Sequence, residues 1–180
     1  NTSVVVAFHL DHKFRRTLND GDEGHSLMAV LLEHTILRQV MSTPELAEQI
    51  APYLKDEYFE SQPCATIYAL FGEFYDKYHA IPSFAALRLG LDDVSTLSER
   101  EAKETSETLT EIEQMDAMEP SQHDYLIEQA EKYCQDRALY VALRKSVAML
   151  DNPEETPHGI PDLLRDALTV SFDTHVGHDF

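Results

Sequence analysis

The sequence predicts an all-α fold: a small helical head, then a long helical hairpin, then a C-terminal linker helix. Apolar residues recur every three or four positions through most of the 180 residues, which is the spacing of one helix face. Ser, Thr and Pro signals for helix starts precede several of these runs. The pattern divides the chain into an N-terminal arm at 1–24, the head at 25–93, the hairpin at 94–150 and a linker segment at 151–180.

The arm differs in pattern from the head that follows it. Its β-branched run "SVVVAFHL" predicts a short strand or an extended arm, "LDHKFRRTL" predicts one or two helical turns, and "NDGDEG" is a loop by composition. A wide apolar stripe from Leu27 to Met41 then predicts the first helix of the head. Thr43 followed by Pro44 predicts the start of a short second helix.

An aromatic helix is expected at 62–79. Its apolar residues repeat on one face: Ile67, Leu70, Phe71, Phe74 and Tyr78. Aromatic platforms for nucleic acid also carry Lys and Arg, but Lys77 is the only Lys or Arg between Asp56 and Ser83. Core packing is therefore favoured over a stacking platform, with a tyrosine edge left for a partner. A further short helix is expected to start at Ser83 and end at Gly90.

Two capping-box patterns predict the hairpin. Thr96 with Glu99 begins a very polar helix that runs to about Met118, and Ser121 with Asp124 begins a longer helix to about Leu150. The polar helix must lie on a surface or in a two-helix hairpin, since few of its residues are apolar. The longer helix carries four bases, which we expect to pair with the acidic helix of the same hairpin: Lys132, Arg137, Arg144 and Lys145.

The segment after the hairpin is expected to be a linker followed by a short amphipathic helix. "DNPEETPHG" has the Pro, Gly and acidic content of a linker, and a helix is predicted at 161–170. A helix of that length is marginal alone in water, so it needs a partner surface. The rest of the sequence offers no obvious core for it.

The net charge is −19, from 33 carboxylates and 14 bases. Binding to a phosphate backbone normally rests on Lys and Arg, so this charge favours protein partners over direct contact with DNA. Adaptation to a salty environment is a second explanation. The longest apolar runs are too short to cross a bilayer. Cys64 and Cys134 are widely spaced, which indicates buried thiols in a reducing, cytoplasmic compartment.

Motifs for catalysis are absent from the sequence. It contains no GxxxxGK[ST], GxGxxG, HExxH or GxSxG pattern, so we expect no catalytic, cofactor-binding or metal-binding residue in it. Two histidine pairs have a three-residue spacing that can share a metal on a helix, His9 with His12 and His175 with His178. A metal-dependent hydrolase built on them is the third and weakest hypothesis.

The order of features resembles the N-terminal domain of DnaB-type replicative DNA helicases, in the variants encoded by tailed bacteriophages. The resemblance rests on the first apolar helix and on "PELAEQIAPYLKDEYFESQPCATIYALFGEFYDKYHAIPSFAAL". The hairpin, the linker and the amphipathic helix before "VGHDF" follow in the same order, and "FHLDHKF" resembles the opening of such proteins. The stretch "TLNDGDEGHS" departs from the pattern, which leaves the role of the arm open.

The resemblance implies an assembly domain rather than an enzyme. Such helicases form hexameric rings, and their N-terminal domains pair through the hairpins into a collar that docks primase or a helicase loader. ATP and Mg would belong to a motor domain outside this chain, which alone would contact DNA. The resemblance also implies a bacterial, possibly phage-encoded, protein. The alternative is a stand-alone helical adaptor that binds and modulates a helicase or a primase.

The resemblance also implies two sets of site residues. Self-association into dimers to hexamers is expected on the longer hairpin helix, at Tyr133, Arg137, Tyr140, Leu143 and Val147. Contact with the motor domain of a neighbouring subunit is expected on the linker helix, at Leu163, Leu164, Ala167 and Leu168.

Overall fold

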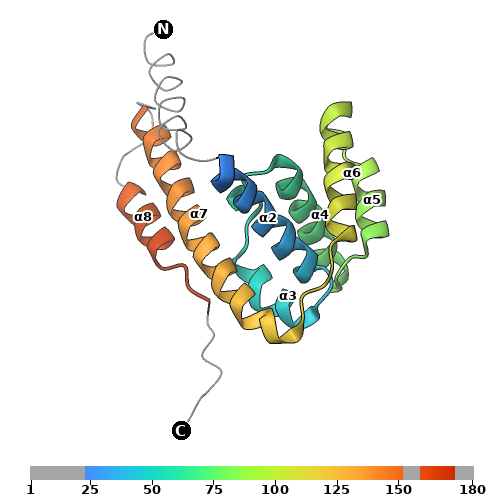
Figure 1. Ribbon diagram of the computed structural model, residues 1–180. Helices are drawn as coiled ribbons and strands as arrows, with labels where there is room; N and C mark the ends of the chain where they lie inside the picture. The colour runs from blue at the N-terminus through green and yellow to red at the C-terminus, as the bar shows by residue number, and fades with distance from the viewer. Residues whose placement is uncertain (1–22, 152–158, 173–180) are drawn as a thin grey trace.

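A computed structural model describes residues 23–151 and 159–172 (Figure 1). The helices are α2 (Glu23–Val40), α3 (Pro44–Ile50), α4 (Gln62–Tyr78), α5 (Phe84–Asp92), α6 (Glu99–Gln114), α7 (His123–Asp151) and α8 (Ile160–Leu168). Three single 3-10 turns join them, η1 (Ala51–Tyr53), η2 (Asp56–Tyr58) and η3 (Pro120–Gln122). These segments contain no strand, and the predicted all-α class is confirmed. Most of the predicted arm and both histidine pairs lie outside the described residues.

Local signals place several helix starts where the sequence predicts them. Pro44 opens α3 directly after an extended Thr43. The Ser61 hydroxyl accepts the N–H of Cys64 at the start of α4, and the Ser83 hydroxyl does the same for Ala86 in α5. Each of these bonds satisfies an N–H that has no partner within its helix.

Other boundaries differ from the prediction. The capping box of α6 is formed by Ser98 and Glu101, not by Thr96 and Glu99, because Ser98 is the residue whose extended backbone aims its hydroxyl at the third N–H. Gly90 lies inside α5, which continues to Asp92. A Cβ atom at Gly90 would lie 3.5 Å from the Leu70 side chain of α4, which is an ordinary contact distance, so the helix continues through this glycine without a tight approach.

The second half of the predicted hairpin also begins differently. Ser121 lies within the turn η3, and α7 starts only at His123. The polar helix before it ends at Gln114 rather than near Met118. The chain from Met115 to Glu119 is extended at both ends and separates α6 from α7.

The pairing of α6 with α7 into a hairpin is not observed. The polar helix α6 packs mainly on α4, α5 and α2, whereas α7 packs mainly on α8, α3 and η2. Figure 1 shows the two helices diverging on opposite sides of α2 and α4. The physical reason is that the thin apolar seam of α6, Leu109 and Ile112, is already buried against the head. In addition, Arg38 of α2 donates to the Met115 carbonyl at 2.7 Å and fixes the direction of the connection.

One continuous apolar core joins the head to α7. Its fully buried large apolar side chains come from the five helices α2 to α6 and include Ile36, Leu37, Leu46, Ile50, Ile67, Leu87, Leu109 and Ile112. The core prediction for the aromatic helix is confirmed for its first half, where Ile67 and Phe71 are buried. Tyr75 is exposed in the last turns, and so is Tyr78, for which the prediction of a core position is wrong because α4 extends past the helices that cover its first half.

Candidate interaction surfaces on α7 and α8

The inner face of α7 carries the main polar connection between α7 and the head. The Tyr133 hydroxyl lies 2.7 Å from Oε1 of Glu33 on α2 and 2.9 Å from the carbonyl oxygen of Tyr58. Arg137, one turn further on, donates its Nε to the same carbonyl at 2.6 Å. One helix turn of α7 therefore holds both α2 and the segment that leads into α4.

Glu33 is the centre of this network and is fully buried. It accepts the backbone N–H groups of Glu60 at 2.6 Å and Ser61 at 3.2 Å, which lie just before α4. Burial away from water raises the pKa of Glu33 above its ordinary value, even though the hydrogen bonds from Tyr133, Glu60 and Ser61 oppose the shift. Burial likewise raises the pKa of the Tyr133 hydroxyl, so it stays protonated.

Two bases of α7 form ion pairs with acids of the lead-in to α4. Lys145 Nζ lies 2.6 Å from Oε2 of Glu57, and Arg137 lies 3.0 Å from Oε1 of Glu60. For Arg137 and Lys145, the expectation that the bases of this helix pair with the acidic helix before it is therefore wrong. The cause is the fold, which places the residues between α3 and α4, rather than α6, beside α7.

The short helix α8 lies on α7 of the same chain. Ala167 is buried, and Leu163 and Leu164 pack against the core. The expectation that the chain has no core left for this helix is thus wrong, because the side of α7 around Val141 and Ala142 provides one.

The chain after α8 is also anchored. The ring of Phe172 is buried and stacks on Tyr53 with centroids 4.4 Å apart. The Phe172 N–H and the Ser171 hydroxyl both donate to Oε1 of Glu131 on α7, at 2.9 and 3.0 Å. These contacts hold Ser171 and Phe172 against α7 and η1.

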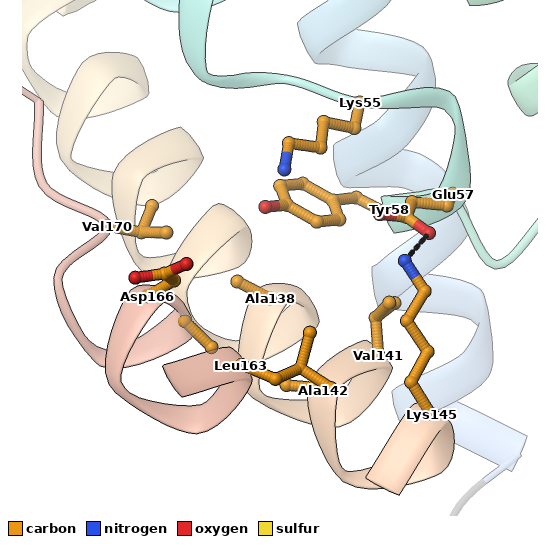
Figure 2. Close-up of a pocket in the computed structure, with 11 residues that line it drawn as sticks. Lys55, Glu57, Tyr58, Ala138, Val141, Ala142, Lys145, Leu163, Asp166 and Val170 are labelled. Atoms are coloured by element: carbon orange, nitrogen blue, oxygen red, sulfur yellow. Dashed lines mark ion pairs between the residues drawn. The ribbon is translucent and has the colours of Figure 1, made fainter. Parts of the chain in front are cut away.

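A pocket of about 160 Å³ remains between α7, α8 and η2 (Figure 2). Its floor is apolar: Ala138, Val141, Ala142, Leu163, Ala167 and Val170. Figure 2 shows the Tyr58 ring forming one wall, with Lys55 above it and Asp166 on the α8 side. A cavity of roughly 150 Å³ holds one benzene molecule. The pocket is thus the size of one apolar side chain.

The outer face of the C-terminal half of α7 is a second apolar surface. Leu143, Val147 and Leu150 are 44, 48 and 65% exposed and recur at four and three positions. Val141 and Leu143 are two positions apart, which at about 100° per residue puts them on nearly opposite sides of the helix. We call Leu143, Val147 and Leu150 the outer stripe. It lies opposite the side of α7 that packs on the head.

The predicted self-association residues do not form one surface. Tyr133 is 7% exposed, and Arg137 is largely covered and tied to Tyr58 and Glu60. Tyr140 is half-buried beneath the Arg137 guanidinium, 4.6 Å from its ring centre. Leu143 and Val147 belong to the outer stripe. The fold therefore separates the five residues into an internal group and an exposed pair.

The four predicted linker-helix residues divide in a similar way. Leu163, Leu164 and Ala167 face α7, whereas Leu168 is 72% exposed. Four further residues of these contacts were not predicted from the sequence: Glu33, Tyr53, Glu131 and Phe172. A signal for Glu33 was present, because it precedes Ile36, Leu37 and Val40 by three, four and seven positions on the apolar face of α2.

The prediction of two buried cysteines is confirmed. Cys64 and Cys134 are free thiols with no exposed surface. Burial raises the pKa of each thiol to about 12, which keeps both protonated at neutral pH. Within residues 23–151 and 159–172, no cluster of three or more His, Cys, Asp or Glu could hold a metal ion. No helix in that part of the chain is both long enough and apolar enough to cross a membrane.

Comparison with known proteins supplies the remaining observation. No family model matches the chain. Among curated proteins, it is 31% identical over 164 residues to a DnaB-like replicative helicase of Enterobacteria phage T4. The chain is related to a DnaB-like replicative helicase. The match covers 86% of this chain but 32% of that helicase, so the chain spans about a third of the length of its relative.

Proposed function

We propose that this chain is the N-terminal collar domain of a replicative DNA helicase. In this role it promotes assembly of the ring and docks a primase or a helicase loader. Unwinding, with ATP and Mg, belongs to a motor domain outside the chain, and the motor makes the contact with DNA. The relationship to a phage T4 helicase supports this function. It also favours a cytoplasmic role in a bacterium, in a phage-encoded protein.

The observation that carries the proposal is the second apolar face of α7. A helix in a single-domain protein normally buries one apolar face and exposes a polar one. Here α7 buries Ala130, Cys134 and Val141 on one side and exposes the outer stripe on the other. An exposed apolar surface of this kind is typical of a protein interface. The proposed occupant is the outer stripe of a second copy, because identical stripes related by a twofold axis form a self-complementary contact.

The charge of the chain is consistent with this arrangement. A net charge of −19 opposes close approach of two copies, so a contact between them needs an apolar centre. It also disfavours a direct grip on DNA phosphates and suits a domain whose partners are proteins. Of the linker helix, Leu168 is the predicted contact residue that remains exposed for a neighbouring motor domain.

Light scattering across a concentration series tests the proposal. The native chain should form dimers or larger species, and the double variant Leu143→Asp/Val147→Asp should be monomeric. Leu89→Asp is a matched control, since Leu89 is exposed on the distant helix α5. It should associate like the native chain. A native chain that stays monomeric at its solubility limit would contradict the collar.

A mixing experiment separates the collar from the adaptor. An adaptor should co-elute with an intact helicase of this type and change its ATPase rate without associating with itself. A collar domain should mainly associate with its own copies and should bind the primase or the loader. Binding of neither protein, together with a monomeric state, would exclude both functions.

A further inference from the structure

The buried carboxyl of Glu33 lies at the junction of three elements and has no role in the proposed assembly. It belongs to α2, accepts two N–H groups from the lead-in to α4 and touches the Tyr133 hydroxyl of α7. None of the ion pairs among the described residues includes Glu33. A buried charge without an ion-pair partner is costly, which favours the neutral form of the carboxyl.

The hydrogen-bond distances around Tyr133 indicate an additional proton on the Glu33 carboxyl. The Tyr133 oxygen lies 2.7 Å from Oε1 of Glu33 and 2.9 Å from the Tyr58 carbonyl oxygen. Both distances are those of hydrogen bonds, yet a hydroxyl has one proton to donate. The Tyr58 carbonyl cannot donate. Each contact becomes a full two-centre hydrogen bond if Glu33 supplies a proton of its own, whereas without that proton the single Tyr133 proton must be shared between two acceptors.

We propose that Glu33 binds a proton in the folded protein and that this proton acts as a pH-sensitive latch between α2 and α7. In the latched form, the Glu33 carboxyl O–H donates to the Tyr133 oxygen. The Tyr133 O–H in turn donates to the Tyr58 carbonyl. Loss of the proton leaves a buried carboxylate and two oxygens in contact without a hydrogen between them, which loosens α7 from the head.

The other charged and titratable groups of the junction do not neutralise a carboxylate there. On α7, Arg137 is engaged with the Tyr58 carbonyl and with Glu60. In the lead-in, the Glu60 carboxylate adds negative charge, which raises the pKa of Glu33 further. On α4, burial holds Cys64 as a neutral thiol. Burial and the neighbouring charge thus favour the proton on Glu33.

The direction of the pH dependence follows from the raised pKa of Glu33. The folded state binds the proton more tightly than the unfolded state, whose carboxyl has the ordinary value of 4.5. The stability from the latch is fully present below that value and is lost as the pH rises through the folded pKa.

Glu33→Gln tests the proposal, because an amide reproduces the neutral carboxyl. Its oxygen can accept from Glu60 and Ser61, and its N–H can donate to Tyr133. Below pH 4.5, which is the ordinary pKa of a glutamate carboxyl, we expect the variant and the native chain to have the same midpoint of thermal unfolding. At neutral pH the variant should unfold at a higher temperature than the native chain. A lower midpoint at neutral pH would show that the ionised carboxylate is the native form and would overturn the proposal.

The control is Glu128→Gln, which removes one negative charge from the exposed side of α7. It reports the general effect of lowering the net charge and should shift the midpoint less than Glu33→Gln does. An equal shift of the unfolding midpoint in the two variants would contradict the proposed proton on Glu33.

A direct measurement on the native chain covers the case in which Glu33→Gln does not fold. NMR of protein labelled with ¹³C in the glutamate side chains follows each carboxyl carbon during a pH titration. The Glu33 signal should titrate above the ordinary value of 4.5, and amide exchange around Tyr133 should rise over the same pH range after correction for intrinsic rates. Titration at or below the ordinary value would exclude the bound proton.

Discussion

The two sides of α7 differ in how far the rest of the chain covers them. The inner side is complete: its apolar residues are buried and the polar atoms of Tyr133 and Arg137 have partners in the head. The outer stripe is equally apolar in sequence but remains exposed. Apolar spacing therefore marks a helix face, but it does not decide whether the chain itself buries that face.

Truncating one leucine on each side of α7 should show the largest difference. Leu126 is 2% exposed on the inner side, so Leu126→Ala should lower the free energy of unfolding by about 2–5 kcal/mol. Leu143→Ala removes the same atoms from the outer stripe and should change the stability of the monomer by less than about 0.5 kcal/mol. Urea unfolding at low protein concentration measures both. Equal losses would mean that the outer stripe is buried within the single chain.

Removing one hydroxyl should have a smaller effect, confined to the inner side. Tyr133→Phe leaves the buried Glu33 carboxyl without that partner and should cost about 1–3 kcal/mol of folding free energy. Tyr125→Phe is the matched control, because Tyr125 is exposed near the start of the same helix. Its stability should stay unchanged in the same urea experiment. If Tyr133→Phe leaves the free energy of unfolding unchanged, the polar network does not hold α7 in place.

The smallest effect is expected for the ion pair at the edge of the inner side. Both side chains of the Lys145–Glu57 pair are partly exposed, so Lys145→Gln should cost at most about 1 kcal/mol, and less in high salt. Lys132 is exposed on α7, and no ion pair is found for it among the described residues. Lys132→Gln therefore provides the baseline. A salt-independent loss at Lys145 would indicate a packing role for its aliphatic stem at the pocket.

Local chemistry made part of this structure predictable. Pro44 and Ser83 start helices because a fixed φ or a hydroxyl acceptor at that position acts within one helical turn. The core role of Ile67 and Phe71 followed from their spacing. The resemblance to a DnaB-like replicative helicase was also available from the order of the elements, and the relationship to the phage T4 protein confirms it at that level.

The partner of each helix was not predictable in the same way. The sequence by itself determined the helices, the acidic character of the chain and the candidate apolar residues of α7. Only the tertiary structure decided that α6 lies on the head instead of on α7, that α8 covers α7, and that Tyr133 points inward to Glu33 while Leu143 points outward. The reason is that helix formation and capping depend on residues within a few positions of one another. The choice of which faces meet depends on contacts such as Tyr133 with Glu33, which are 100 residues apart in the chain.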